Sequence, residues 1–153
     1  MAKHVHLTLD DRYIISNLLN SSTSFKAIGI EIDKDCTTIS KEVRNHCVYK
    51  QTGAFGKAFN SCIHRQGCDH RKLCTDCKSN RYCWSCKSCN SVCADFKRET
   101  CSKLKHAPYV CNGCTKLKSC TLEKCFYHPG SAHNEYQETL SESRQGLSLS
   151  EAE

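Results

Sequence analysis

The sequence predicts a mainly α N-terminal domain of three helices, followed by a small irregular module that metal ions hold together. Apolar residues recur at helical spacing between residues 8 and 46. Thirteen of the 15 cysteines of this 153-residue chain lie between residues 62 and 125, where Ile, Val, Leu and Phe are few. A segment with so small an apolar core needs cross-links to fold.

Composition and charge divide the chain into three segments, residues 1–50, 51–128 and 129–153. Residues 61–128 carry 13 basic and 5 acidic side chains, a net charge of +8, whereas residues 129–153 carry 1 basic and 5 acidic ones, a net charge of −4. The N-terminal run MAKHVHLTLDD is polar where a signal peptide would be apolar, and no apolar run approaches the ~18 residues of a membrane span. We therefore expect a soluble, intracellular protein with a polar, acidic helical tail.

The first predicted helix opens with TLDD, in which Thr8 and Asp11 have the spacing of a capping box. Its inward face is expected to carry the apolar residues Tyr13, Ile14, Ile15 and Leu18. The second predicted helix begins at Ser24, and its inward positions are Phe25, Ile28, Gly29 and Ile32. The third runs from about Thr37 to His46, with inward residues Ile39 and Val43.

Four residues, DKDC, separate the second predicted helix from the third. A helix, a tight turn and a second helix with few inward residues is the plan of a helix-turn-helix DNA-binding domain. Short hydroxyls near a helix start can approach phosphates or base edges, and basic side chains supply donors for phosphate or guanine. The candidate DNA contacts are the outer polar residues of the third helix, Thr37, Thr38, Ser40, Lys41 and Arg44. The alternative is a plain three-helix bundle with a solvated polar face; the short turn and the hydroxyl-rich third helix favour DNA binding.

Closely spaced cysteines predict metal sites in the second segment. Cys74 with Cys77 and Cys111 with Cys114 have the two-residue spacing that lets both sulfurs reach one ion. In sequence order, twelve cysteines divide into three groups of four: Cys62, Cys68, Cys74 and Cys77; Cys83, Cys86, Cys89 and Cys93; Cys101, Cys111, Cys114 and Cys120.

Other partitions stay open, because cross-braced sites interleave their ligands. The residues that could replace a cysteine as ligand are His64, His70, His106 and Cys125. Cys36 and Cys47 lie on or beside the third helix, where we expect small buried hydrophobes.

Zinc is the metal that the cysteine pattern favours, with about three structural ions per chain, because all-cysteine ligation leaves no open coordination position. The run CWSCKSCNSVC has the spacing of a bacterial ferredoxin, so an iron–sulfur redox protein is an alternative. Ferredoxins of that kind place proline after the fourth cysteine and usually repeat the run, whereas Ala94 follows here and the sequence has no second copy.

The runs HLTLDDRYIISNLL and SFKAIGIEIDKDCTTISKEVRNH resemble the N-terminal helix-turn-helix of transposases of the insertion-sequence-thirty (IS-thirty) family. QTGAFGKAFNSC, the cysteine-rich block, PYVCNGC and SCTLEKCFY are similar to the branch of that family with a cysteine-rich insert. Asp33 departs from the pattern where Gly is common, and Gly29 where Ala is frequent. The resemblance implies a bacterial protein, cytoplasmic and nucleoid-associated, that binds the terminal inverted repeats of a transposable element in double-stranded DNA. It leaves self-association open and implies no membrane partner.

The third segment places Ala132, Tyr136 and Leu140 on one helical face, which the run SRQG is expected to break. Ser148 and Glu151 have the spacing of a helix start, but no apolar run follows, so we expect a truncated product. The resemblance implies that family members continue into a catalytic domain with a DDE carboxylate triad. No motif here matches that domain, so we assign no catalytic residue and expect that this chain is not itself an enzyme.

The predicted function is therefore sequence-specific DNA binding, as the N-terminal part of a transposase in DNA transposition and recombination. A stand-alone helix-turn-helix transcription regulator is the main alternative. An iron–sulfur redox protein is less favoured.

Overall fold

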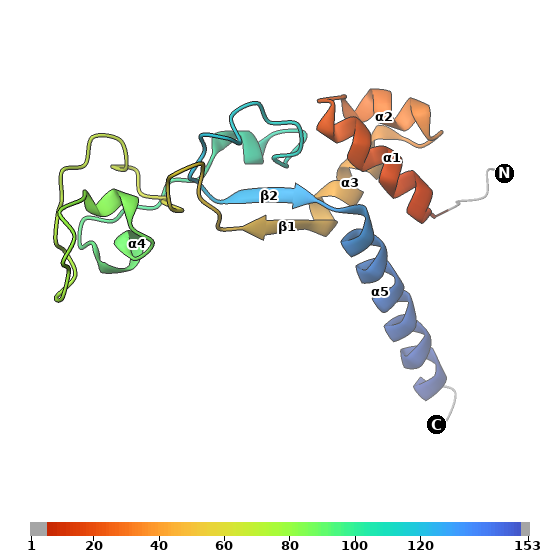
Figure 1. Cartoon of the computed structure of the whole chain (residues 1–153). Coiled ribbons are helices and arrows are strands. Elements are labelled where there is room, and N and C mark those ends of the chain that lie inside the picture. Colours follow the sequence, from red (N-terminus) through yellow and green to blue (C-terminus); the bar gives the residue numbers. More distant parts are fainter. Residues whose placement is uncertain (1–5, 151–153) are drawn as a thin grey trace. The chain divides into compact units, whose positions relative to one another are not determined.

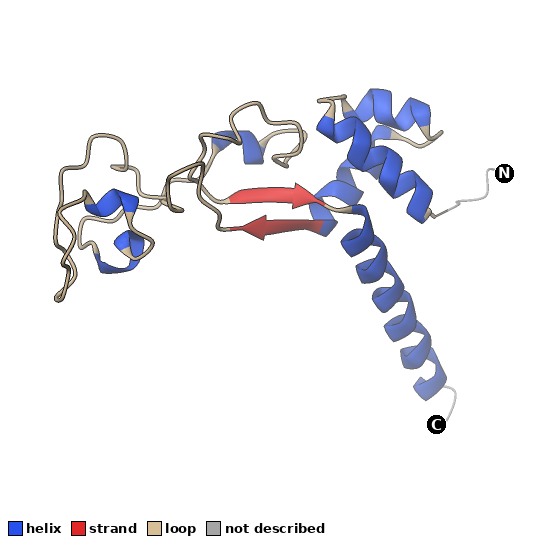
Figure 2. Ribbon diagram, in the orientation of Figure 1, coloured by secondary structure: helices blue, strands red, loops and turns tan. Residues whose placement is uncertain are grey.

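The computed structural model describes residues 6–150, with side chains through Gly146, as two compact units. The first unit combines the N-terminal residues through Val48 with the C-terminal residues from Phe126, and the second comprises Tyr49–Cys125. The longer helices lie in the first unit, whereas loops dominate the second (Figure 2). The expected order of helices followed by a largely irregular cysteine-rich region is confirmed.

Three N-terminal helices build most of the first unit (Figure 1): α1 (Leu9–Asn20), α2 (Phe25–Glu31) and α3 (Cys36–His46). The predicted capping box of α1 is present, since the Asp11 amide donates to Thr8 Oγ1 at 3.1 Å and the Thr8 amide donates to Asp11 Oδ2 at 2.9 Å. The Ser24 hydroxyl caps α2 by accepting from the Ala27 amide at 3.3 Å. Both helix starts therefore lie where the sequence places them.

The predicted inward face of α1 is confirmed at Ile15 but wrong at Tyr13 and Ile14, and Leu18 is half-buried. Tyr13 and Ile14 are exposed, and the buried positions are Arg12, Ile15 and Leu19. Arg12 is only 2% exposed and forms an ion pair with Glu42 of α3, so a charged side chain occupies part of the inward face of α1. A pattern read from apolar residues alone cannot include a buried arginine.

The inward face of α3 is confirmed, and that of α2 is confirmed at Ile28 and Gly29, whereas Phe25 and Ile32 are only half-buried. Ile28 and Gly29 are buried on α2, and Ile39 and Val43 are buried on α3. Together with Ile15 and Leu19 they form the small apolar core of the first unit. This core fixes which side of α3 faces outward.

The C-terminal helix α5 (Pro129–Ser150) is continuous, so the expected break at SRQG is wrong. A single glycine costs a helix only ~1 kcal/mol relative to alanine, and the run contains no proline. α5 also packs against α1 as part of the first unit: Ala132 is buried, and the Arg12 guanidinium lies 4.8 Å from the centre of the Tyr136 ring. The pair Ser148 and Glu151 lies outside the described side chains.

None of the helices in residues 6–150 combines the length and the apolar character that crossing a membrane requires. The strands β1 (Cys47–Lys50) and β2 (Lys124–Tyr127) form a two-stranded sheet, through which the chain leads into and out of the cysteine-rich unit. Within that unit the regular elements are short: η1 (Cys83–Ser85), α4 (Cys89–Val92) and η2 (Ser102–Lys105).

The second unit has a sparse core. Its buried hydrophobic residues include four cysteines beside Val110 and Leu122: Cys62, Cys83, Cys89 and Cys125. Lys124 is buried as well, and its ammonium donates to the carbonyls of Thr52, Cys120 and Leu122 at 2.7–3.3 Å. So little apolar material supports the expectation that this unit needs a cross-link other than a hydrophobic core.

Candidate DNA-binding helix and metal-binding cysteine clusters

Gly29 and Asp33 shape the turn between α2 and α3. Asp33 adopts the left-handed conformation with φ +53°, which Asp tolerates better than most side chains. The Lys34 amide donates to the Gly29 carbonyl at 2.8 Å, and a Cβ at Gly29 would lie 2.4 Å from the Lys34 carbonyl oxygen. Glycine at position 29 is therefore required by this close approach.

Asp35 caps the N-terminus of α3, a role that the sequence analysis missed. Its Oδ1 accepts from the Thr37 amide at 2.8 Å and from the Thr37 hydroxyl at 2.6 Å. The Thr37 hydroxyl, followed by its amide, lowers the pKa of the Asp35 carboxyl below its ordinary value of 3.8. The Thr37 hydroxyl proton is thus used within the turn. In this arrangement the Thr37 hydroxyl has no proton left to donate to a DNA phosphate.

The remaining candidate DNA contacts lie on the outer side of α3. Thr38, Lys41 and Arg44 are exposed, and Ser40 is half-buried. A surface hollow of about 550 Å³ beside them is lined by Lys34, Thr38, Lys41 and Asn45 among other residues. Asn45 is exposed and stands four positions after Lys41, and its amide can pair with an adenine edge. This spacing was visible in the sequence, so Asn45 could have been included among the candidates.

A buried polar network holds α3 against α1. Arg12 Nε donates to Glu42 Oε1 at 2.7 Å, and the Tyr127 hydroxyl donates to the same oxygen at 3.0 Å. Burial first, and then the negative charge of Glu42, raises the pKa of the Tyr127 hydroxyl far above its ordinary value. Because Glu42 lies between Lys41 and Val43, this network fixes the rotation of α3 and keeps Lys41 outward.

All fifteen cysteines fall within the described residues, and none of them is in a disulfide bond. Cys36 is exposed and Cys47 half-buried, so the expectation of a buried cysteine is wrong for Cys36. Cys36 is the first residue of α3, where the helix starts at the surface.

Four cysteines that are distant in the sequence line one cavity of about 610 Å³: Cys62, Cys68, Cys89 and Cys93. Helix α4 places Cys93 one turn after Cys89, and the Cys93 amide donates to the Cys89 carbonyl at 3.1 Å. Burial raises the pKa of the Cys89 thiol to about 11, with smaller contributions from Cys93, Cys68, Cys83 and Cys62. A thiol with this pKa stays protonated at neutral pH unless a cation takes the place of the proton.

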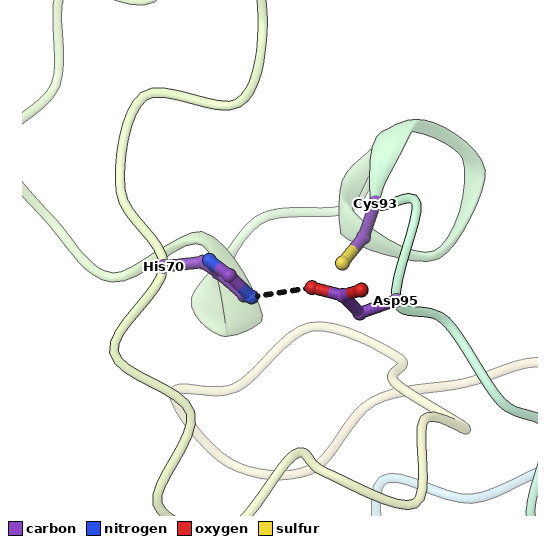
Figure 3. A group of neighbouring side chains, drawn as sticks. All are labelled: His70, Cys93 and Asp95. Carbon is purple, nitrogen blue, oxygen red and sulfur yellow. Dashed lines mark hydrogen bonds and ion pairs between the residues drawn. The ribbon is translucent and has the colours of Figure 1, made fainter.

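His70 and Asp95 stand beside Cys93 in the same cavity (Figure 3). The Nε2 atom of His70 lies 3.1 Å from Asp95 Oδ2, and the ligand atoms of all three residues lie within 4.8 Å of one another. Within residues 6–150, this is the one group of three His, Cys, Asp or Glu ligand atoms so close together. His70 is one of the substitute ligands that the sequence predicts, whereas nothing in the sequence distinguishes Asp95 from other acidic residues.

A second cavity, of about 400 Å³, is lined by the last predicted group: Cys101, Cys111, Cys114 and Cys120. The Cys114 amide donates to the Cys111 carbonyl at 3.0 Å, which closes a tight turn between the two sulfurs. Burial raises the pKa of the Cys111 thiol, and the Cys125 amide donates to its sulfur at 3.5 Å. The structure therefore places these four cysteines around one cavity.

The other four predicted ligands lie on two turns: Cys74 with Cys77, and Cys83 with Cys86. The Cys77 amide donates to the Cys74 carbonyl at 3.3 Å, and the Cys86 amide donates to the Cys83 carbonyl at 3.0 Å. The Leu73 amide, just before the first turn, donates to the Cys83 sulfur at 3.5 Å. The Leu73 contact therefore places the first turn beside Cys83 of the second turn.

Comparison with known proteins identifies the N-terminal part of the chain. Residues 3–46 match the family model described as "Helix-turn-helix domain", a domain often found in transposases. Searches among curated proteins and among solved structures find no match. The match spans α1, α2 and α3 and the turn that Gly29 and Asp33 shape. Residues 3–46 are therefore a helix-turn-helix domain, whose expected partner is DNA.

Proposed function

We propose that this chain is the DNA-recognition part of a bacterial transposase and that α3 enters the major groove of double-stranded DNA. The observation that carries the proposal is the exposed polar and basic side of α3, with Thr38, Lys41 and Arg44, in a helix-turn-helix domain. In such domains the second helix of the motif contacts base edges with its N-terminal residues. Thr38 and Lys41 lie in this half of α3.

The target and the biological setting follow from the family resemblance. We propose that the chain binds the terminal inverted repeats of its element, in the bacterial cytoplasm, and that it recruits a catalytic domain with a DDE triad. In such a triad, carboxylates hold two divalent ions that position the attacking oxygen. By this proposal the present chain recognises DNA and carries out no chemistry itself.

Binding to DNA is tested with the full chain and labelled duplexes that are selected from a random-sequence library. If Lys41 or Arg44 reads a base, its replacement by alanine should weaken binding to the selected sequence by roughly 5- to 150-fold, equivalent to ~1–3 kcal/mol. If it contacts phosphate, binding should weaken equally on all sequences, and the slope of log affinity against log salt should fall by about one. Fluorescence anisotropy at several salt concentrations separates these outcomes.

Arg144→Ala is the matched control, because it removes one positive charge from an exposed position on α5. It should leave both the affinity and the salt slope close to those of the wild type. Unchanged binding by Lys41→Ala and Arg44→Ala together would contradict the proposed role of α3.

We further propose that the cysteine-rich unit is a structural zinc module. Each of two cavities is lined by four cysteines, and zinc prefers tetrahedral sites built from four such thiolates. A zinc ion with four thiolates carries a local charge of −2, and the net +8 of residues 61–128 offsets several such sites. Protein purified under reducing conditions should be colourless and contain zinc, whereas a brown colour with absorption near about 400 nm would indicate an iron–sulfur cluster instead.

A further inference from the structure

We propose that the cysteines between residues 62 and 93 form two nested metal sites rather than two consecutive ones. The outer site uses Cys62, Cys68, Cys89 and Cys93. The inner site uses Cys74, Cys77, Cys83 and Cys86. This inference deepens the proposed zinc module and depends on it, because it assigns the ligands that share each ion.

The backbone of this region folds back on itself in two antiparallel layers. In the outer layer the Ile63 amide donates to the Lys97 carbonyl at 2.8 Å, and Cys62 forms a bridge with Arg98. This pairing brings the chain at Cys62, the first cysteine of the region, beside the chain that follows Cys93, the last one. Cys62 thereby approaches Cys93, although 30 residues separate them.

A second, inner backbone pairing joins residues that lie between Cys62 and Arg98 in the sequence. Arg71 forms an antiparallel bridge with Tyr82, and the Cys83 amide donates to the His70 carbonyl at 2.8 Å. These contacts join the two ends of the loop of residues 72–81, which carries Cys74 and Cys77. Since the Leu73 amide also donates to the Cys83 sulfur, the turn with Cys74 faces the turn with Cys83.

The cavities divide the sulfurs in the same way. The 610 Å³ cavity is lined by all four outer cysteines and by none of the four inner ones.

Metal binding would draw each set of four sulfurs closer together. Zinc–sulfur bonds of about 2.3 Å place tetrahedral sulfur ligands roughly 3.8 Å apart. His70 and Asp95 already lie beside Cys93. In the proposed site they contact each other and support Cys93 from outside the four thiolate ligands, and neither replaces a thiolate. His70→Ala should therefore retain the full zinc content.

Two double variants distinguish nested from consecutive sites. Cys68→Ala with Cys89→Ala removes two ligands of one nested site, so the zinc content should fall from about three ions per chain to about two. Cys68→Ala with Cys77→Ala removes one ligand from each nested site, so the content should fall to about one. Consecutive sites predict the reverse order. The reverse order, or loss of an ion in His70→Ala alone, would overturn the nested assignment.

A second measurement uses the wild-type protein and does not depend on the folding of variants. A chelator is added in steps, the thiols released are alkylated, and mass spectrometry identifies which cysteines become labelled together. Nested sites predict that Cys68 is labelled with Cys89 and Cys93, and Cys77 with Cys83 and Cys86. Labelling of Cys68 together with Cys77 would refute the nesting while leaving zinc binding intact. Protein that binds no zinc at all would refute the zinc module itself, and the nesting with it.

Discussion

At Gly29 the backbone of α2 lies so close to the Lys34 carbonyl that no side chain fits. Glycine in place of alanine costs the helical conformation of α2 up to ~1 kcal/mol. In return, the close approach allows a short turn that ends at Asp35, the N-cap of α3. Glycine at this position belongs to the geometry of the turn, because the carbonyl that it faces comes from the turn itself. A substitution at Gly29 therefore tests the geometry of the helix-turn-helix motif more directly than a substitution of a surface residue does.

Gly29→Ala should destabilise the first unit by ~1–3 kcal/mol, because a Cβ placed 2.4 Å from a backbone oxygen forces the turn to shift. Urea unfolding followed by the helical circular dichroism signal measures this loss. Gly146→Ala is the matched control, since a Cβ there meets nothing within 4 Å and alanine favours the helix. The explanation fails if Gly29→Ala stabilises the protein as Gly146→Ala does.

The helices of the first unit are joined by polar as well as apolar contacts. Arg12 of α1 pairs with Glu42 of α3, and Tyr127 of β2 donates to the same carboxylate. His46 of α3 in turn lies 2.7 Å from Glu135 of α5. A buried ion pair adds little net stability but makes the loss of one partner severe, so it selects one rotation of α1 and α3 over others.

Arg12→Met should cost the first unit ~3–5 kcal/mol, because Glu42 is then buried without its cation. Adding Glu42→Leu and Tyr127→Phe should restore part of this loss, since the buried carboxylate and hydroxyl are removed, whereas the Leu7 carbonyl still lacks its Arg12 donor. The free energy of urea unfolding measures both changes.

Arg144→Met provides the control for Arg12→Met, because it is the same substitution at an exposed position of α5. Its effect should stay within about 0.5 kcal/mol. An equally small effect of Arg12→Met would show that the buried pair does not hold α1 to α3.

Across the whole molecule, the two units depend on different sources of stability. The first has an apolar core and the helices α1, α2, α3 and α5, whereas the second has short helices and buried cysteines. Trp84, the single tryptophan of the sequence, lines both cavities of the second unit. Its fluorescence therefore reports on the cysteine-rich unit, while the helical signal reports mainly on the helix-turn-helix unit.

Removal of metal with a chelator should shift the Trp84 emission to the red, because the cysteine-rich unit loses its cross-links. The helical circular dichroism signal should change little, since the first unit has its own core. Parallel fluorescence and circular dichroism titrations check this expectation, and Trp84→Phe should remove the fluorescence change. Simultaneous loss of both signals would show that the first unit also depends on the metal.

Local signals explain what the sequence predicted well. The caps at Thr8 and Ser24 and the inward residues Ile39 and Val43 depend on neighbours within one or two helical turns. The misses depend on distant partners. Arg12 is buried because of Glu42, 30 residues away, and Cys68 shares a cavity with Cys89 because backbone pairing folds the chain back on itself. The spacing of residues within one segment of the sequence cannot predict contacts between such distant residues.

The strands β1 and β2 are hydrogen-bonded neighbours at the point where the chain leaves the helical unit and returns to it. The two ends of the cysteine-rich unit are therefore held side by side, which is the arrangement that lets a polypeptide cassette be added or removed with little disturbance to its host. A two-residue hairpin turn could join the same strands in its place. This connectivity makes the cysteine-rich unit a portable part that could be shuffled between DNA-binding proteins as a single piece.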